Sequence, residues 1–146
     1  MKTNLEKVGP CGTACSECVA AKDDPRVISH LVANGFPASA LPCRGCRAIE
    51  GHCPSPSLQG RQCGIFSCVR GRNLTFCYEC EEAPCERLSP AENPGRYRYH
   101  NTKTFNLLYI RNRGLDAFCA DIKKLQERYF GSELKVVGEP PEPKAP

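Results

Sequence analysis

Apolar residues recur at helical spacing mainly in the last third of this chain. Leu107, Leu108 and Ile110 indicate one helix that begins near Thr102. After Gly114, a second apolar stripe with spacings of three and four residues contains Leu115, Phe118, Cys119, Ile122, Leu125 and Tyr129. This pattern predicts two helices between Thr102 and about Phe130, interrupted at Gly114.

The first 90 residues contain much less periodic apolar sequence. One helix is predicted there, because Asp24 can cap it and Pro25 suits the first helical position. Its apolar positions are Val27, Ile28, Leu31 and Val32. Asn34 and Gly35 supply its stop signal. A shorter helix is expected to begin near Ile65.

These patterns divide the chain into three expected parts. Residues 1–90 form a lobe rich in Cys, Pro and Gly, residues 91–131 form a helical segment that packs on it, and residues 132–146 form a largely disordered, Pro-rich tail. The predicted fold class is a small metal-stabilised domain. It consists mainly of short α-helices and irregular loops with zinc-knuckle-like turns, followed by a C-terminal helical segment.

The cysteine content is the feature that adds most to this prediction of the fold. Twelve of the 146 residues are cysteine. Eleven of them lie in the first lobe and are the candidate metal ligands: Cys11, Cys15, Cys18, Cys43, Cys46, Cys53, Cys63, Cys68, Cys77, Cys80 and Cys85. Many are separated by only two residues, a spacing that suits ligation of one ion and rarely permits a relaxed disulfide.

A secreted, disulfide-bonded domain is the alternative. It needs a route to an oxidising compartment, and residues 1–10 contain neither a long apolar run nor a small-residue cleavage site. No stretch approaches the length of a membrane span. We therefore expect a cytoplasmic protein with reduced, metal-binding cysteines and no membrane association.

The formal net charge of +4 does not by itself indicate a nucleic-acid partner. A zinc ion with four thiolates carries a net charge of about −2, so two such sites would cancel the basic excess. Arg61, Arg70 and Arg72, with Arg96, Tyr97, Arg98 and Tyr99, could contact single-stranded nucleic acid. Ordinary surface charge and N–H donation to metal-bound sulfur explain the same residues.

Two four-cysteine sites are the simplest arrangement. Cys15, Cys18, Cys43 and Cys46 form one natural quartet. Cys68, Cys77, Cys80 and Cys85 form the second. Cys11, Cys53 and Cys63 could replace a member of either quartet, or join His52 in a third site. Cys119 is expected to be a core thiol, because it lies on the apolar helical face.

Zinc, at about two ions per chain, is the expected cofactor, because Cys pairs around a Gly-containing turn such as Cys43–Cys46 are common in structural zinc sites. Iron–sulfur clusters of the [4Fe–4S] type remain the alternative, since their ligands also occur as closely spaced triplets. The triplet of Cys11, Cys15 and Cys18 has the spacing found in radical-SAM enzymes. Such enzymes need a larger domain than this chain offers.

The order of these motifs resembles a cysteine-rich domain family of unknown function, found in bacteria and archaea and suggested to bind metal. The resemblance rests on CGTACSEC, CRGCR, the run C-x4-C-x8-C-x2-C-x4-C ending in CYECEEAPCERL, and NLLYIRNRGLDAF. It spans roughly residues 9–130. It implies a compact metal-binding domain, with all candidate ligands except Cys53 carried over.

The expected function is therefore that of a metal-binding module that interacts with a protein partner or assists a larger complex. An iron–sulfur electron-transfer protein and a nucleic-acid-binding zinc module are the alternatives. No nucleophile–base arrangement indicates an enzyme. Glu79, Glu81, Glu82 and Glu86 are expected to form a solvated acidic face.

Overall fold

The computed structural model describes residues 3–58, 60–88 and 102–131. Its α-helices are α1 (Pro25–Ala33), α2 (Gly64–Gly71), α3 (Thr102–Arg113) and α4 (Leu115–Gly131). Short 3₁₀ helices fill much of the remaining described chain: η1 (Leu5–Lys7), η2 (Cys15–Glu17), η3 (Val19–Ala21), η4 (Ala38–Ala40), η5 (Pro56–Leu58), η6 (Cys77–Glu79) and η7 (Glu86–Leu88). The predicted fold class, short helices with irregular loops and a C-terminal helical segment, is confirmed.

Helix α1 forms for the local reasons that its sequence indicates. The Asp24 carboxylate accepts a hydrogen bond from the Arg26 backbone N–H at 2.8 Å, and Pro25 occupies the first helical position. The helix ends at Asn34, and Gly35 follows with a φ of +87°. Of the four apolar positions predicted to form its stripe, Leu31 is buried and Val32 is exposed.

Helices α3 and α4 form a hairpin that turns at Gly114, as the sequence predicts. Gly114 has a φ of +87°, a left-handed conformation that favours glycine. Tyr109 on α3 packs edge-on against Phe118 on α4, and its hydroxyl donates to the Asp121 carboxylate at 2.6 Å. Of the three apolar residues that indicated α3, Leu107 and Ile110 are buried and Leu108 is exposed.

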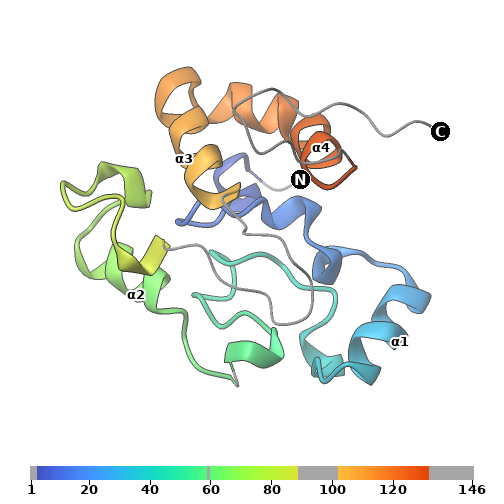
Figure 1. The fold of residues 1–146 in the computed structure, drawn as a ribbon. Coiled ribbons are helices and arrows are strands. Elements are labelled where there is room, and N and C mark those ends of the chain that lie inside the picture. Colours follow the sequence, from blue (N-terminus) through green and yellow to red (C-terminus); the bar gives the residue numbers. More distant parts are fainter. Residues whose placement is uncertain (1–2, 59, 89–101, 132–146) are drawn as a thin grey trace.

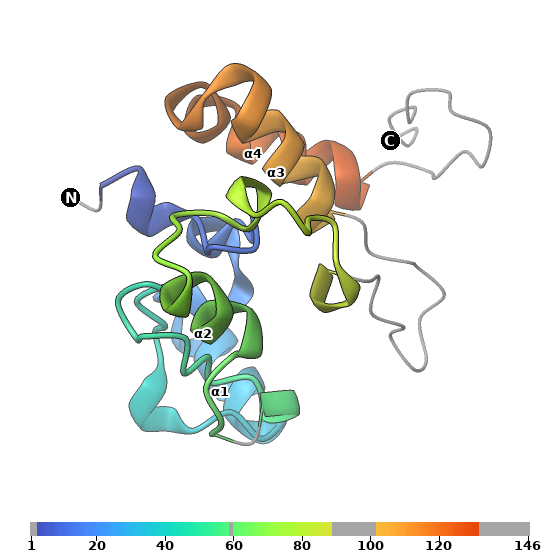
Figure 2. The ribbon, with the colours of Figure 1, turned by 90° about the vertical axis from the view of Figure 1, so that its left-hand side faces the viewer.

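A single buried cluster joins this hairpin to the cysteine-rich lobe. Phe118 of α4 and Val8 of the N-terminal segment are fully buried within it. Around them lie side chains from α2, α3, α4 and both ends of the lobe: Cys11, Ala14, Ile65, Val69, Phe76, Leu88, Leu107, Ile110 and Ile122. Figures 1 and 2 show the α3–α4 hairpin lying over the N-terminal segment, with α1 and α2 farther away.

Irregular backbone dominates the lobe. In the described residues, β-type pairing is limited to one isolated antiparallel bridge between Val8 and Ala14. None of the helices described is long and apolar enough to cross a bilayer. The expected disordered tail, residues 132–146, lies outside the described residues, as does the side chain of Tyr129.

Candidate metal centre

All twelve cysteines are free thiols. The eleven in the lobe fall into two sets by their neighbours. The first thiol group contains Cys11, Cys15, Cys18, Cys43, Cys46, Cys53 and Cys63. The second thiol group contains Cys68, Cys77, Cys80 and Cys85. The two predicted quartets therefore each fall within one set.

Gly9 lies between two members of the first thiol group. A side-chain carbon at this glycine would contact the Cys15 sulfur and the Cys46 Cβ, each at 3.5 Å. Gly45 in turn adopts a φ of +102° beside the Cys15 Cβ. The Gly in the Cys43–Cys46 turn therefore lets the second cysteine pair approach the first closely.

Burial sets the protonation of Cys15 and Cys46. It is the main cause that raises the pKa of Cys15 to about 11, and the neighbouring thiols of Cys11, Cys18 and Cys43 add to the rise. Burial likewise raises the pKa of Cys46 to about 12. Without a metal ion these two thiols are therefore neutral at pH 7.

Two backbone hydrogen bonds bring the later cysteines of this group to the earlier ones. Gly51 N–H donates to the Cys46 carbonyl, and Cys63 N–H donates to the Gly51 carbonyl, both at 2.9 Å. Burial raises the pKa of Cys53, with smaller contributions from the nearby thiols of Cys43, Cys18 and Cys63. Cys53 and Cys63 therefore belong beside the first quartet.

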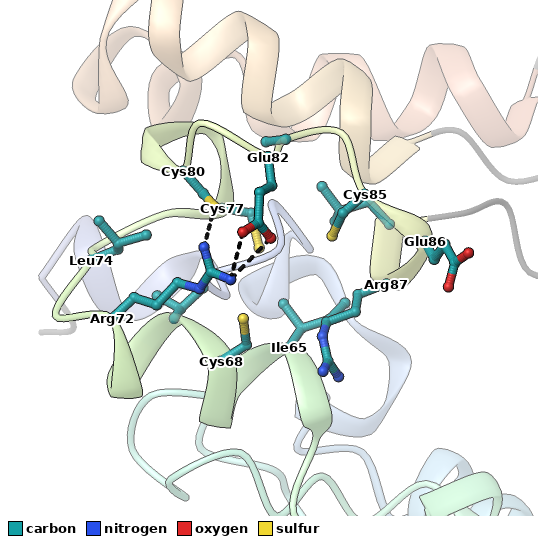
Figure 3. A pocket seen from close by; sticks show the side chains of 13 residues that line it. Ile65, Cys68, Arg72, Leu74, Cys77, Cys80, Glu82, Cys85, Glu86 and Arg87 are labelled. Carbon is teal, nitrogen blue, oxygen red and sulfur yellow. Dashed lines mark hydrogen bonds and ion pairs between the residues drawn. The ribbon is translucent and has the colours of Figure 1, made fainter.

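The second thiol group surrounds a cavity. Its four cysteines line a space of about 610 Å³ between α2 and the segment that contains η6 and η7 (Figure 3). Cys68 lies on α2, Cys77 begins η6, Cys80 follows η6, and Cys85 precedes η7. Burial is the main cause that raises the pKa of Cys77 to about 12.

Cys11 connects the two groups. Its thiol lies close enough to those of Cys15, Cys46 and Cys77 to contribute to their raised pKa values. The backbone supports this position, because the Cys77 N–H donates to the carbonyl of Pro10 at 2.9 Å. Cys11 is therefore a shared neighbour, which the sequence left unassigned.

Arg72 interacts directly with a cysteine of the second thiol group. Its Nη1 donates to the Cys80 sulfur at 3.1 Å, and its Nη2 donates to both carboxylate oxygens of Glu82, at 3.0 and 2.9 Å (Figure 3). These contacts fit the interpretation of the basic residues as N–H donors to sulfur. Glu82 is an anchor for Arg72, a role that the sequence did not suggest.

Arg47, next to Cys46, holds three parts of the lobe together. Its guanidinium donates to the Val8 carbonyl at 3.0 Å and to the Thr75 carbonyl at 2.7 Å, and it lies 4.9 Å from the centre of the Phe76 ring. Burial lowers its pKa from the ordinary value. The sequence showed only an arginine after a cysteine, and no local signal could have indicated these partners.

Glu79 is exposed, as expected, and also has a structural role. Its carboxylate accepts hydrogen bonds from the backbone N–H groups of Thr75 at 2.8 Å and Phe76 at 3.2 Å. It thereby caps η6, which begins with the ligand candidate Cys77. Glu79 is therefore part of the local structure that positions this cysteine.

Other described candidates have partners inside the protein. Arg70 pairs with Glu50 at 3.1 Å, and Arg61 donates to the Leu58 carbonyl at 3.3 Å. His52 is exposed, with its Nδ1 3.3 Å from the Ile49 carbonyl. Arg96, Tyr97, Arg98 and Tyr99 of the predicted basic patch lie outside the described residues.

The thiols of each group lie near one another, but they are not arranged around one common point where an ion could bind. Within residues 3–58, 60–88 and 102–131, no three His, Cys, Asp or Glu side chains form a group arranged to hold a metal ion. The donor chemistry nevertheless fits a soft metal, because sulfur is abundant in both groups. Binding of a single ion would require the sulfurs of either group to move closer together.

Comparison with known protein families gives a match, which covers the cysteine-rich lobe. Residues 7–90 match a family model described as a protein of unknown function, DUF3795. This chain belongs to the DUF3795 family. The DUF3795 match contains all eleven cysteines of the two thiol groups and ends before α3. No curated protein and no solved structure matches the chain.

Proposed function

We propose that this protein is a metal-binding module in which cysteine thiolates hold structural zinc, at about two ions per chain. The observation that carries the proposal is the gathering of eleven free thiols into two groups. The first group combines cysteines from segments that are well separated in sequence, whereas the second comes from residues 68–85. Thiolate is the preferred ligand for structural zinc.

The first thiol group favours zinc most clearly. Its quartet of Cys15, Cys18, Cys43 and Cys46 comes from two short turns, which is the usual source of ligands in a structural site. Zinc would also add stability, because such sites contribute on the order of 10 kcal/mol to folding. A lobe built largely of loops and 3₁₀ helices benefits from that contribution.

The role that we infer for this protein is to interact with a protein partner or to assist a larger complex. A zinc ion with four thiolate ligands has no open position for water or substrate, so such a site stabilises structure and does not activate water. Twelve free thiols suit a reducing compartment, and we place the protein in the cytoplasm. A protein partner fits this role better than a nucleic acid, since the described arginines of the basic patch have intramolecular partners.

Metal analysis of the purified full chain tests the proposal. Protein made in zinc-supplemented medium should retain metal in the first thiol group through gel filtration. Cys15→Ser and Cys46→Ser should each lose about one metal equivalent, whereas Cys119→Ser, outside both groups, should lose none. Folded wild-type protein that retains no metal would overturn the proposal.

A further inference from the structure

The second thiol group differs from a single-ion site in its geometry. A zinc ion holds each sulfur at about 2.3 Å, which brings the four sulfurs within about 4 Å of one another. Here the four cysteines line a cavity of about 610 Å³, which is larger than the space that a single ion occupies. In Figure 3 the sulfurs of Cys68 and Cys85 point into this space from opposite walls.

The side chains that line the cavity leave room for a group larger than a single metal ion. Ile65 and Val69 of α2 and Leu88 of η7 are buried and line it together with the cysteines. The thiols come from α2, from both ends of η6 and from the residue before η7. Arg72, Glu82, Glu86 and Arg87 line it as well, so the wall is both apolar and charged. Four cysteines around one cavity match the ligand set of a [4Fe–4S] cluster.

Arg72 supplies a further feature of such a site. Its N–H group donates to the Cys80 sulfur at 3.1 Å, and Glu82 holds the guanidinium through two hydrogen bonds. Hydrogen bonds to ligand sulfur are one of the means by which a protein sets the reduction potential of a cluster. The first thiol group has arginine Arg47 nearby, but the groups that accept its hydrogen bonds are backbone carbonyls.

We propose that the second thiol group binds one [4Fe–4S] cluster through Cys68, Cys77, Cys80 and Cys85, while the first group holds zinc. Arg72 is a positioning residue, which donates to the Cys80 ligand sulfur. This inference rests on the proposed function, because it takes the cysteines to be metal ligands, and it assigns a cluster in place of the second of the two zinc ions. It names the metal class of one site and distinguishes the two sites.

The test uses the full chain, purified without oxygen from cells supplied with iron and zinc, and reconstituted with ferrous iron and sulfide where needed. The expected content is about four iron, four acid-labile sulfide and one zinc per chain, with a broad visible absorption. Cys68→Ser and Cys85→Ser should lose iron and sulfide but keep zinc. Cys15→Ser should lose zinc but keep the cluster, and Cys119→Ser should keep both.

The outcomes separate this inference from the proposed function. Two zinc ions per chain, with no iron bound after reconstitution, would overturn the cluster and leave the metal-binding module intact. Folded protein with neither metal would overturn both. A cluster that survives Cys68→Ser and Cys85→Ser but is lost in Cys15→Ser would also overturn this assignment, because it would place the cluster in the first group.

Arg72 is tested by titrating the cluster potential with dithionite as reductant. Removing the N–H donor in Arg72→Met should make the potential more negative, because a hydrogen bond to sulfur stabilises the more negative, reduced state. Arg72→Lys, which keeps the charge, should give a smaller shift. Unchanged potentials in both variants, at unchanged iron content, would overturn the positioning role of Arg72.

Discussion

The side chain of Asn106 on α3 donates a hydrogen bond to the carbonyl of Gly12, with a distance of 2.7 Å between the two atoms. Asn106 is 2% exposed, and Gly12 lies in the loop between Cys11 and Cys15. A helix outside the matched family region therefore fixes the loop that carries the first cysteines. The first thiol group consequently depends on α3 for its geometry.

We expect Asn106→Ala to lower the free energy of unfolding by about 1–3 kcal/mol, because the Gly12 carbonyl would lose its buried partner. Asn112→Ala on the exposed side of the same helix is the matched control and should change it by less than about 0.5 kcal/mol. Denaturant unfolding of both variants, at equal metal content, measures the difference. Equal stabilities would show that the hydrogen bond contributes nothing.

Gly12 itself should not accept a side chain. Its φ is +83°, and an added Cβ would lie 2.7 Å from the Lys103 carbonyl oxygen of α3. We expect Gly12→Ala to cost at least about 2 kcal/mol, from the left-handed backbone and the clash together. Gly71→Ala is the control, because a Cβ there meets no atom within 4 Å. Thermal unfolding of the two variants should give clearly different midpoints.

Even the conservative substitution of Arg47 by lysine should lower the stability of the protein. Arg47→Ala removes two hydrogen bonds to backbone carbonyls and the contact with the Phe76 ring, and should cost on the order of 3 kcal/mol. Arg47→Lys should recover only part of this, since a lysine cannot donate in the same forked geometry. Arg26→Lys, at a side chain that is 92% exposed, should be neutral in the same unfolding measurement.

Zinc affinity should rise with pH. Burial raises the pKa of Cys15 to about 11 and that of Cys46 to about 12, so both thiols are protonated in the metal-free protein at pH 7. Zinc binds the thiolate, and each of these ligands must therefore release one proton. Between pH 6 and 8, competition with a chelator should show affinity increasing up to about tenfold per pH unit for each proton released. A pH-independent affinity would contradict this protonation state.

Cys119 should behave as an isolated, weakly reactive thiol. Burial raises its pKa, and its sulfur lies 3.6 Å from the Asn4 carbonyl oxygen, to which it donates. A raised pKa lowers the thiolate fraction, so alkylation by iodoacetamide at pH 7.5 should be slower than for an exposed cysteine and should accelerate above pH 9. Mass spectrometry of metal-loaded protein should find Cys119 labelled before the eight cysteines of the two quartets. Faster labelling of those eight would contradict their role as ligands.

Local features of the fold could be predicted because they depend on neighbouring residues. The cap at Asp24, the stop at Gly35 and the break at Gly114 each follow from the conformational preference of one residue. Cys119 was expected on the apolar face of its helix and does pack against the core. The two predicted quartets each lie within one thiol group, whereas spacing left Cys11, Cys53 and Cys63 unassigned.

Long-range contacts could not be predicted in the same way. The Arg47 hydrogen bond to Val8 spans 39 residues, and that of Asn106 to Gly12 spans 94. An arginine or an asparagine in the sequence does not by itself indicate that its partner is a distant backbone carbonyl. The position of Cys11 between the two thiol groups likewise depends on how the loops fold over the core, which spacing along the chain does not determine.

The shared core has a practical consequence for how the unit of folding is defined. The family match ends at residue 90, yet Phe118 and Ile122 of α4 fill the same buried cluster as Val8 and Phe76. A fragment cut at the edge of the match would leave those lobe residues facing water. The edge of the family match is therefore not the edge of the buried core, and a fragment intended to keep that core intact must extend through α4.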